Sequence, residues 1–211
     1  MKRAAGIIII LISFSVLCLF FPLFHIVPLK RAETEKSEGA FDAAKFADSL
    51  WSEKLAKSFD HATDAKELLA AIRTDPAAAQ KKYARTLNLG GGYFYYLRGE
   101  GRVMATNDSG LSLVITPGAT NAEVTLETGM IFGNAVRDGT GLLNASDYPN
   151  LQDFNNISAG LNKLVEARVL PVLRDHPSVG STIHFVGCAE VDDETTDLNP
   201  LQVVPVQAEV E

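Results

Sequence analysis

The chain has 211 residues, 46% of them hydrophobic, and carries 19 Lys and Arg against 26 Asp and Glu, which gives a formal net charge of −7. Four of the 19 basic residues flank an N-terminal apolar run, so the rest of the chain has 15 basic against 26 acidic residues. An acidic body without a basic stripe argues against nucleic-acid binding, because a phosphate backbone needs several Lys or Arg contacts.

The N-terminus carries a long apolar run. Lys2 and Arg3 precede residues 4–24, which contain no charge. As a helix this run is about 32 Å long and can cross a bilayer core of roughly 30 Å. Bulky residues end the run where a signal peptide would carry small ones. We expect residues 1–29 to be an uncleaved single-pass anchor, with residues 4–29 in the cytoplasmic membrane and the body in the periplasm; a cleaved export signal is the alternative.

The two cysteines are far apart in the sequence. Cys18 lies inside the apolar run, and Cys188 lies in a strand-like stretch. We therefore expect no intrachain disulfide, which is compatible with an exported protein that has a sufficient core. A lipid-attachment site needs small residues before its cysteine, whereas Val16 and Leu17 precede Cys18. We expect no lipidation at this position.

A polar linker and a helical segment follow the anchor. Residues 30–40 are charged and poor in large apolar groups, which predicts a short linker. We expect a helical segment over residues 41–87. Apolar residues recur every three to four positions across residues 41–59, which predicts its first helix. Asp64 has a Glu three positions later, the spacing of a capping box, and so predicts the start of a second helix. Pro76 suits the first turn of a third helix, where the missing N–H of proline costs least.

Downstream of the helical segment the pattern changes to strands. Gly99 and Gly101 interrupt a long aromatic stretch, which predicts a first strand that bends at these glycines. Residues 110–116 and 122–129 alternate between apolar and polar side chains and predict the second and third strands. Residues 130–141 are interpreted as a further short strand followed by a turn.

The C-terminal third contains a helix and two strands. Apolar residues at helical spacing predict a helix over 155–171, and strand patterns follow over 181–191 and 201–210. Pro205 suits an edge strand or a bulge. Three strands, a helix and two strands are the order of an OB-type five-stranded Greek-key barrel. We expect an α+β fold with an OB-like domain over 88–211, packed with the helical segment; a generic α+β sandwich is the alternative.

Residue constellations typical of catalysis are missing from the sequence. The four histidines are scattered, and neither a nucleophile elbow nor a phosphate loop is present. His184 and Cys188 share one face of a strand, but four residues at ~3.3 Å each put them about 13 Å apart, too far to bind one metal ion. We expect no enzymatic activity, no metal and no cofactor.

One polar cluster remains as a candidate ligand-binding site. Its members, which could converge at one end of the barrel, are Arg137, Asp138, Asp147, Asn155 and Asn156. Planar polar groups of this kind bind oligosaccharides. In the alternative interpretation, Arg137 pairs with an acid, while the asparagines cap a helix and tighten a turn. An enzyme that used Asp138 or Asp147 as its acid would lack a supporting nucleophile–base pair.

Several stretches across nearly the whole chain resemble one known family. They are "HIVPL", "FDAAKFADSLWSEKL", "YLRGEGRV", "NAVRDG", "DFNNISAGLNKLVEARVL" and "VVPVQAEV". The family contains predicted periplasmic lipoproteins of bacteria and is catalogued as domain of unknown function 2291. The resemblance implies an extracytoplasmic, membrane-tethered body, and genes of the family often lie beside those of sugar ABC transporters. It assigns no catalytic residues.

One position departs from the family pattern. Members of the family usually carry the lipid-bearing cysteine two residues before the isoleucine of "IVPL", where this chain has Phe24. We therefore expect a longer apolar anchor in place of a lipid. Our first functional hypothesis is a non-enzymatic accessory protein whose partner is a sugar ABC transporter or its sugar-binding protein. The alternative is a module that binds a carbohydrate or peptide directly through the barrel face.

Overall fold

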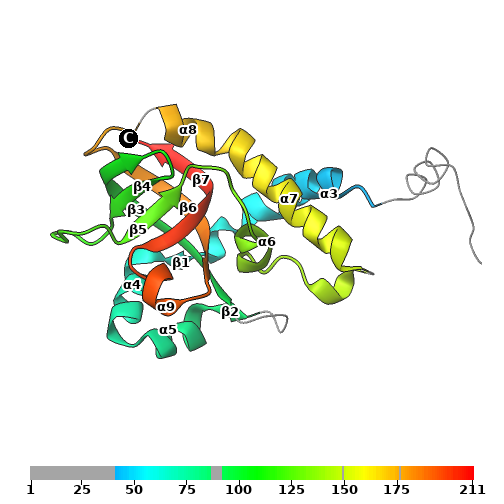
Figure 1. The fold of residues 1–211 in the computed structure, drawn as a ribbon, viewed down its shortest axis with the longest axis horizontal. Helices are drawn as coiled ribbons and strands as arrows, with labels where there is room; N and C mark the ends of the chain where they lie inside the picture. Colours follow the sequence, from blue (N-terminus) through cyan, green and yellow to red (C-terminus); the bar gives the residue numbers. More distant parts are fainter. Residues whose placement is uncertain (1–40, 87–91, 149, 176) are drawn as a thin grey trace, which may run out of the picture. The chain divides into compact units, whose positions relative to one another are not determined.

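The computed structural model describes residues 41–86, 92–148, 150–175 and 177–211, which form a curved sheet with helices packed around it (Figure 1). The predicted anchor, the linker and the predicted boundary between helical segment and barrel lie outside the described residues. Among the helices described, none is both long and apolar enough to cross a membrane.

The helical segment starts with a helix that changes its hydrogen bonding. Asp42 caps it by accepting from the Lys45 amide at 3.0 Å. The prediction of a continuous α-helix over 41–59 is wrong in its second half. Ser52 Oγ donates to the Asp48 carbonyl at 2.9 Å, a side-chain bond that competes with the helical pattern. The elements are α3 (Ala43–Leu50), a π-helical turn (Trp51–Leu55) and a 3₁₀ turn (Ala56–His61).

Two further helices, α4 (Ala65–Thr74) and α5 (Pro76–Tyr83), start as expected. The Asp64 side chain accepts from the amides of Lys66 and Glu67 at 2.9 and 3.1 Å, which confirms the predicted cap. The Glu67 carboxylate accepts from the Tyr83 hydroxyl at 2.6 Å, so it joins α4 to α5. Pro76 is the first residue of α5, where its missing N–H is not needed.

Among the described residues, five strands pair so that each has two partners among the other four. They are β3 (Tyr93–Asn107), β4 (Gly110–Val114), β5 (Val124–Glu127), β6 (Thr182–Val191) and β7 (Leu201–Val210). The order is β3–β4–β5–β7–β6, and β6 also pairs with β3. Only the β5–β7 pairing is parallel among these five. Short strands β1 (Thr63–Asp64) and β2 (Arg85–Thr86) add to β3.

Two irregularities bend this ladder. The register between β3 and β4 shifts between Val103 and Ala105. The register between β6 and β7 shifts between Val186 and Gly187, and Gly187 is paired with Pro205. Proline cannot donate a ladder hydrogen bond, so it is tolerated at such an irregularity. The expectation that Pro205 marks a bulge or an edge is confirmed.

The connection from β5 to β6 is helical. It contains α6 (Ala135–Gly139), a 3₁₀ turn (Ala145–Asp147), α7 (Leu151–Arg168) and α8 (Leu170–Asp175). The prediction of a strand within 130–141 is wrong. Gly133 has a φ of +79°, which interrupts an extended chain, and α6 begins two residues later. The expected helix is confirmed as α7, and Pro171 lies in the first turn of α8, where it needs no N–H donor.

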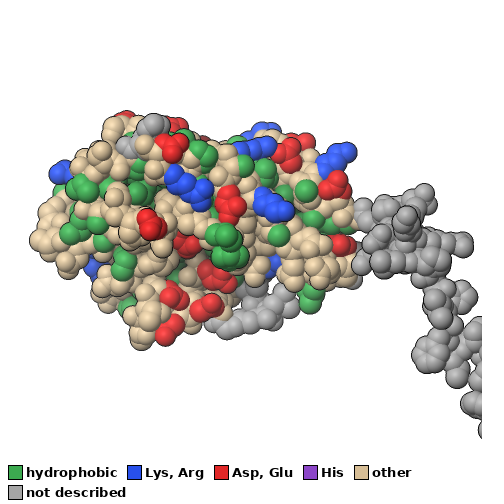
Figure 2. Space-filling view, turned by 45° about the horizontal axis from the view of Figure 1, so that its top comes forward, with side chains coloured by type: hydrophobic (Ala, Val, Ile, Leu, Met, Phe, Trp, Pro, Cys, Tyr) green, Lys and Arg blue, Asp and Glu red, His purple; other side chains and the backbone are tan. Residues whose placement is uncertain are grey.

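Helix α7 lies along α3 (Figure 1). The approach is close, because a Cβ added at Gly160 would lie 2.9 Å from the Ala47 Cβ. The core is continuous from the sheet to these helices. The Cys188 thiol is fully buried, and this burial raises its pKa, so the thiol is unreactive in the folded chain. Figure 2 shows small hydrophobic groups between charged side chains on one face, with Asp and Glu gathered toward its lower part.

Candidate ligand-binding cleft

The predicted polar cluster is partly buried inside the protein. Arg137 and Asp138 of α6 are only 5% and 4% exposed. Arg137 Nε and Nη2 donate to the two carboxylate oxygens of Asp138 at 2.6 and 2.7 Å. Arg137 Nη1 donates to the Asn155 side chain at 3.0 Å and to the Phe154 carbonyl at 3.3 Å. The guanidinium group also lies 3.9 Å from the centre of the Phe154 ring.

The other two members of the cluster do not join this network. Asn156 is exposed on α7 and accepts from the Gln152 amide at 3.0 Å, and Asp147 is exposed in a 3₁₀ turn. The structure therefore brings together Arg137, Asp138 and Asn155. Their hydrogen bonds join α6 to α7, as in the alternative interpretation, in which Arg137 pairs with an acid.

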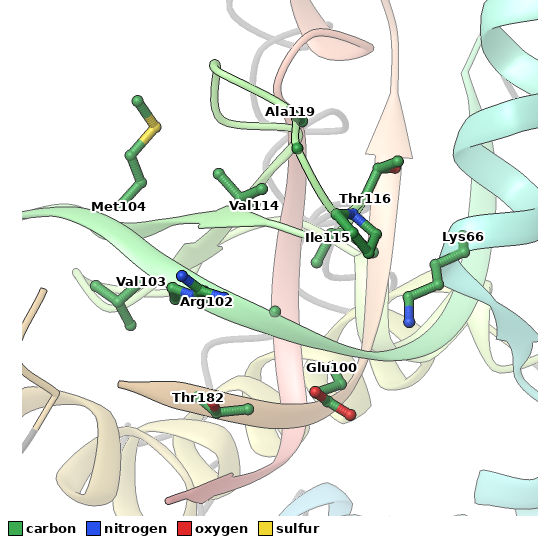
Figure 3. Close-up of a pocket in the computed structure, with 13 residues that line it drawn as sticks. Lys66, Glu100, Arg102, Val103, Met104, Val114, Ile115, Thr116, Ala119 and Thr182 are labelled. Atoms are coloured by element: carbon green, nitrogen blue, oxygen red, sulfur yellow. The ribbon is translucent and has the colours of Figure 1, made fainter. Parts of the chain in front are cut away.

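A cleft of about 420 Å³ lies where β3 bends over β4 (Figure 3). We call it the β3–β4 cleft; it is lined by Lys66, residues 100–104, residues 114–119 and Thr182. These residues come from α4, β3, β4, the loop after β4 and the start of β6. A cleft of this size fits a small molecule.

Charged side chains of both signs line the β3–β4 cleft. Lys66 reaches it from α4, while Glu100 and Arg102 project from β3 (Figure 3). All three side chains are exposed, and within the described part of the chain none of them forms an ion pair. Their hydrogen-bonding groups are therefore open to a ligand, beside exposed apolar side chains such as Pro117.

Two glycines allow α4 and β4 to approach β3. A Cβ added at Gly99 would lie 2.7 Å from the Cβ of Ala65, so only glycine lets the first turn of α4 come this close. The residue after Ala65 is Lys66, which is thereby placed at the cleft. A Cβ at Gly101 would lie 2.6 Å from Ile115 Cδ1. The glycines that predicted a bend therefore also shape the cleft.

Glu123 holds the loop that forms one wall of the cleft. Its carboxylate is 9% exposed and accepts from the Ile115 amide at 2.8 Å, from the Thr116 amide at 2.6 Å and from the Thr116 hydroxyl at 2.8 Å. Arg73 of α4 adds an ion pair. Burial alone would raise the pKa of Glu123, but the hydrogen bonds from Thr116, Arg73 and Ile115 outweigh it and lower this pKa.

The charged residues of this cleft are not among the candidate site residues predicted from the sequence. A usable signal was present in "LRGEGR", where Arg98, Glu100 and Arg102 alternate with glycine along β3 and so lie on one face of the strand. The glycines between them predict a bend, and their spacing also places the three charges on one side of the strand. Within the described ranges, no three or more His, Cys, Asp or Glu side chains are grouped so that they could hold a metal ion.

The strand order and the helices between β5 and β6 define an OB-like α+β protein. A crystal structure of an OB-fold protein from Thermotoga maritima matches with a TM-score of 0.72 at 26% sequence identity, over 82% of this chain and 99% of that one. The model of the predicted periplasmic lipoproteins, DUF2291, matches residues 14–209, so the chain belongs to this family. This description supports a periplasmic, membrane-associated location. No curated protein matches the chain.

Proposed function

We propose that this protein is a membrane-tethered periplasmic accessory protein that binds a carbohydrate in the β3–β4 cleft and acts beside a sugar ABC transporter. The β3–β4 cleft carries the proposal, because its open charges, hydroxyl groups and apolar side chains are complementary to the mixed surface of a sugar. Membership of a family of predicted periplasmic lipoproteins supports the location. The transporter is inferred from the gene neighbourhood that the family resemblance implies.

The chemistry of the lining residues suits a sugar ring. Glu100 can accept from neighbouring hydroxyl groups, while Lys66 and Arg102 can donate to ring and hydroxyl oxygens. Hydrogen bonds to charged groups are stronger than those between neutral groups, which offsets the cost of removing water from the sugar. The half-buried Val114 and the exposed Pro117 can contact the apolar C–H face of the ring. In this role the protein binds its ligand without transforming it.

The tether is part of the same proposal. Residues 4–29 would cross the cytoplasmic membrane once and hold the described body on the periplasmic side. Phe24 stands where the family resemblance implies a lipid-bearing cysteine, so the anchor would be a helix. The acidic body argues against nucleic acid as a partner.

We predict that at least one neutral mono- or disaccharide raises the melting temperature of the full chain in detergent. A ligand that binds only the folded state stabilises it by about 2.7 kcal/mol at one hundred times its dissociation constant. Lys66→Ala and Glu100→Gln should each remove most of this shift, because each deletes a partner of the sugar hydroxyls. Thermal unfolding followed by circular dichroism measures the effect.

The matched control is Lys163→Ala, because Lys163 is an exposed lysine of α7 that does not line the cleft. It should keep the full shift. Two results would count against the proposal: no sugar in the panel changes the melting temperature, or the cleft variants respond like the control.

A peptide is a second candidate ligand. The cleft offers cations in Lys66 and Arg102 and an anion in Glu100, which are complementary to the carboxylate and the ammonium group at the ends of a short peptide. Dipeptides in the same melting assay separate the candidates. A shift with dipeptides and none with sugars would favour the peptide.

A further inference from the structure

The segment that follows β5 presents two large apolar side chains to solvent. We call residues 129–134 the display segment. Its Met130 and Phe132 side chains are 70% and 72% exposed, whereas Ile131 between them is 4% exposed. This alternation turns one side chain into the core and its two neighbours outward. Exposed apolar side chains placed together mark interaction sites more often than scattered ones do.

The N-terminal half of the display segment is held by side chains of the helices that follow it. Arg174 of α8 donates to the carbonyls of Thr128 and Gly129 at 2.7 and 2.8 Å. Glu166 of α7 accepts from the Ile131 amide at 2.9 Å. The backbone on both sides of Met130 is therefore fixed.

The C-terminal half is held in the same way. Ser158 and Asn162 of α7, both buried, donate to the Gly133 carbonyl at 2.9 and 3.1 Å. Glu190 of β6 accepts from the Asn134 amide at 3.5 Å. Met130 and Phe132 thus project from a fixed backbone, so a partner would not have to order this segment on binding.

One acidic side chain, Glu127, lies beside the two apolar ones, and two more bond to the backbone between and after them. A second cleft, of about 550 Å³, is lined by Met130, Phe132 and Glu127. Glu166 and Glu190 each accept from a backbone amide of the display segment. The exposed Arg174 donates to the Gly129 carbonyl within the segment and to the Thr128 carbonyl just before it. Burial raises the pKa of both Glu127 and Glu190 above the ordinary value of a glutamate, so their attraction for a cation weakens as the pH falls into the acidic range.

We propose that the display segment is a docking surface for a protein partner that presents an apolar side chain next to Lys or Arg. Met130 and Phe132 would contact the apolar side chain, while Glu127 and Glu190 would attract the neighbouring cation. This surface adjoins β5 and does not share residues with the β3–β4 cleft, so the proposal does not depend on sugar binding.

Binding of defined peptides to the full chain in phosphatidylcholine nanodiscs tests the proposal. The probe is a fluorescent Gly-Ser peptide with one Phe between two Lys, and its counterpart has two Glu in their place. We expect the Lys peptide to bind at least about tenfold more tightly, a difference of about 1.4 kcal/mol. Phe132→Ser should weaken its binding about tenfold, and Glu127→Gln should reduce the dependence of binding on salt concentration.

Val179→Ser is the matched control, because Val179 is 67% exposed and lies in another loop. It should leave peptide affinity unchanged. Equal affinity for the two peptides, no binding of either, or equal loss in Phe132→Ser and Val179→Ser would overturn the proposal. So would a dimer that Phe132→Ser dissociates in sedimentation, which would assign the surface to a second copy. Binding of the nanodisc-held full chain to added protein-free vesicles, lost in Met130→Ser or Phe132→Ser, would assign the surface to lipid and overturn the proposal.

Discussion

Asp138→Ala is expected to lower the free energy of unfolding by about 3–5 kcal/mol. The substitution leaves the Arg137 guanidinium buried at 5% exposure without the carboxylate that accepts two of its hydrogen bonds. It also weakens the connection between α6 and α7, because Arg137 bonds to Asn155 and to the Phe154 carbonyl. Urea denaturation of the full chain in detergent, followed by circular dichroism, measures the loss.

The double variant Arg137→Met/Asp138→Ala distinguishes two costs: the loss of the ion pair itself and the burial of the Arg137 charge without a partner. Removing both charges should recover part of the stability lost in Asp138→Ala, since no unpaired ion then remains buried. A cost below about 1 kcal/mol for Asp138→Ala, in the range of exposed ion pairs, would contradict a structural role for the pair and reopen it as a binding site.

Glu123→Ala is expected to cost about 3 kcal/mol. The substitution leaves the Ile115 amide, both donors of Thr116 and the Arg73 guanidinium without their shared acceptor. Asp60→Ala is the control, because the Asp60–Arg98 pair is exposed and should contribute less than about 1 kcal/mol. Similar losses in the two variants would show that Glu123 does not hold the cleft wall.

The same carboxylate predicts a pH dependence. Because its folded-state pKa is lowered, Glu123 contributes stability above its unfolded pKa of about 4.3. That contribution is lost as the pH falls through the folded value. Glu123→Gln should therefore show a smaller decrease in unfolding free energy on acidification below about pH 4.3 than the wild type. Equal pH profiles in the two proteins would contradict the lowered pKa.

Much of the fold is predictable from the sequence because its signals are local. Alternation and turn residues identify β4 and β5, Asp64 marks the start of α4, and Pro205 marks an irregularity in the last strands. The wrong prediction of a strand around Gly133 has a cause further along the chain. The pattern around Gly133 is compatible with a strand, and only its packing against Ser158 and Asn162 of α7 decides otherwise.

The candidate site was less predictable, because the same residue types serve structure and binding. Arg137 and Asp138 have the composition of a ligand site, and their burial in a mutual pair depends on α7, which lies further along the chain. The β3–β4 cleft joins Lys66 of α4 to Glu100 of β3, two residues that no single periodic pattern connects. Sequence patterns predict elements, whereas such sites require the contacts between elements.

Uptake of labelled sugar by whole cells tests most directly whether the β3–β4 cleft serves transport. Cells that lack the protein would be complemented with the wild type, with Lys66→Ala/Glu100→Gln or with Lys163→Ala, at equal abundance in the membrane. We predict that import of at least one sugar falls without the protein and is restored by the wild type and Lys163→Ala, but not by the double variant. Unchanged import of every sugar in cells without the protein, or full restoration by the double variant, would contradict this role.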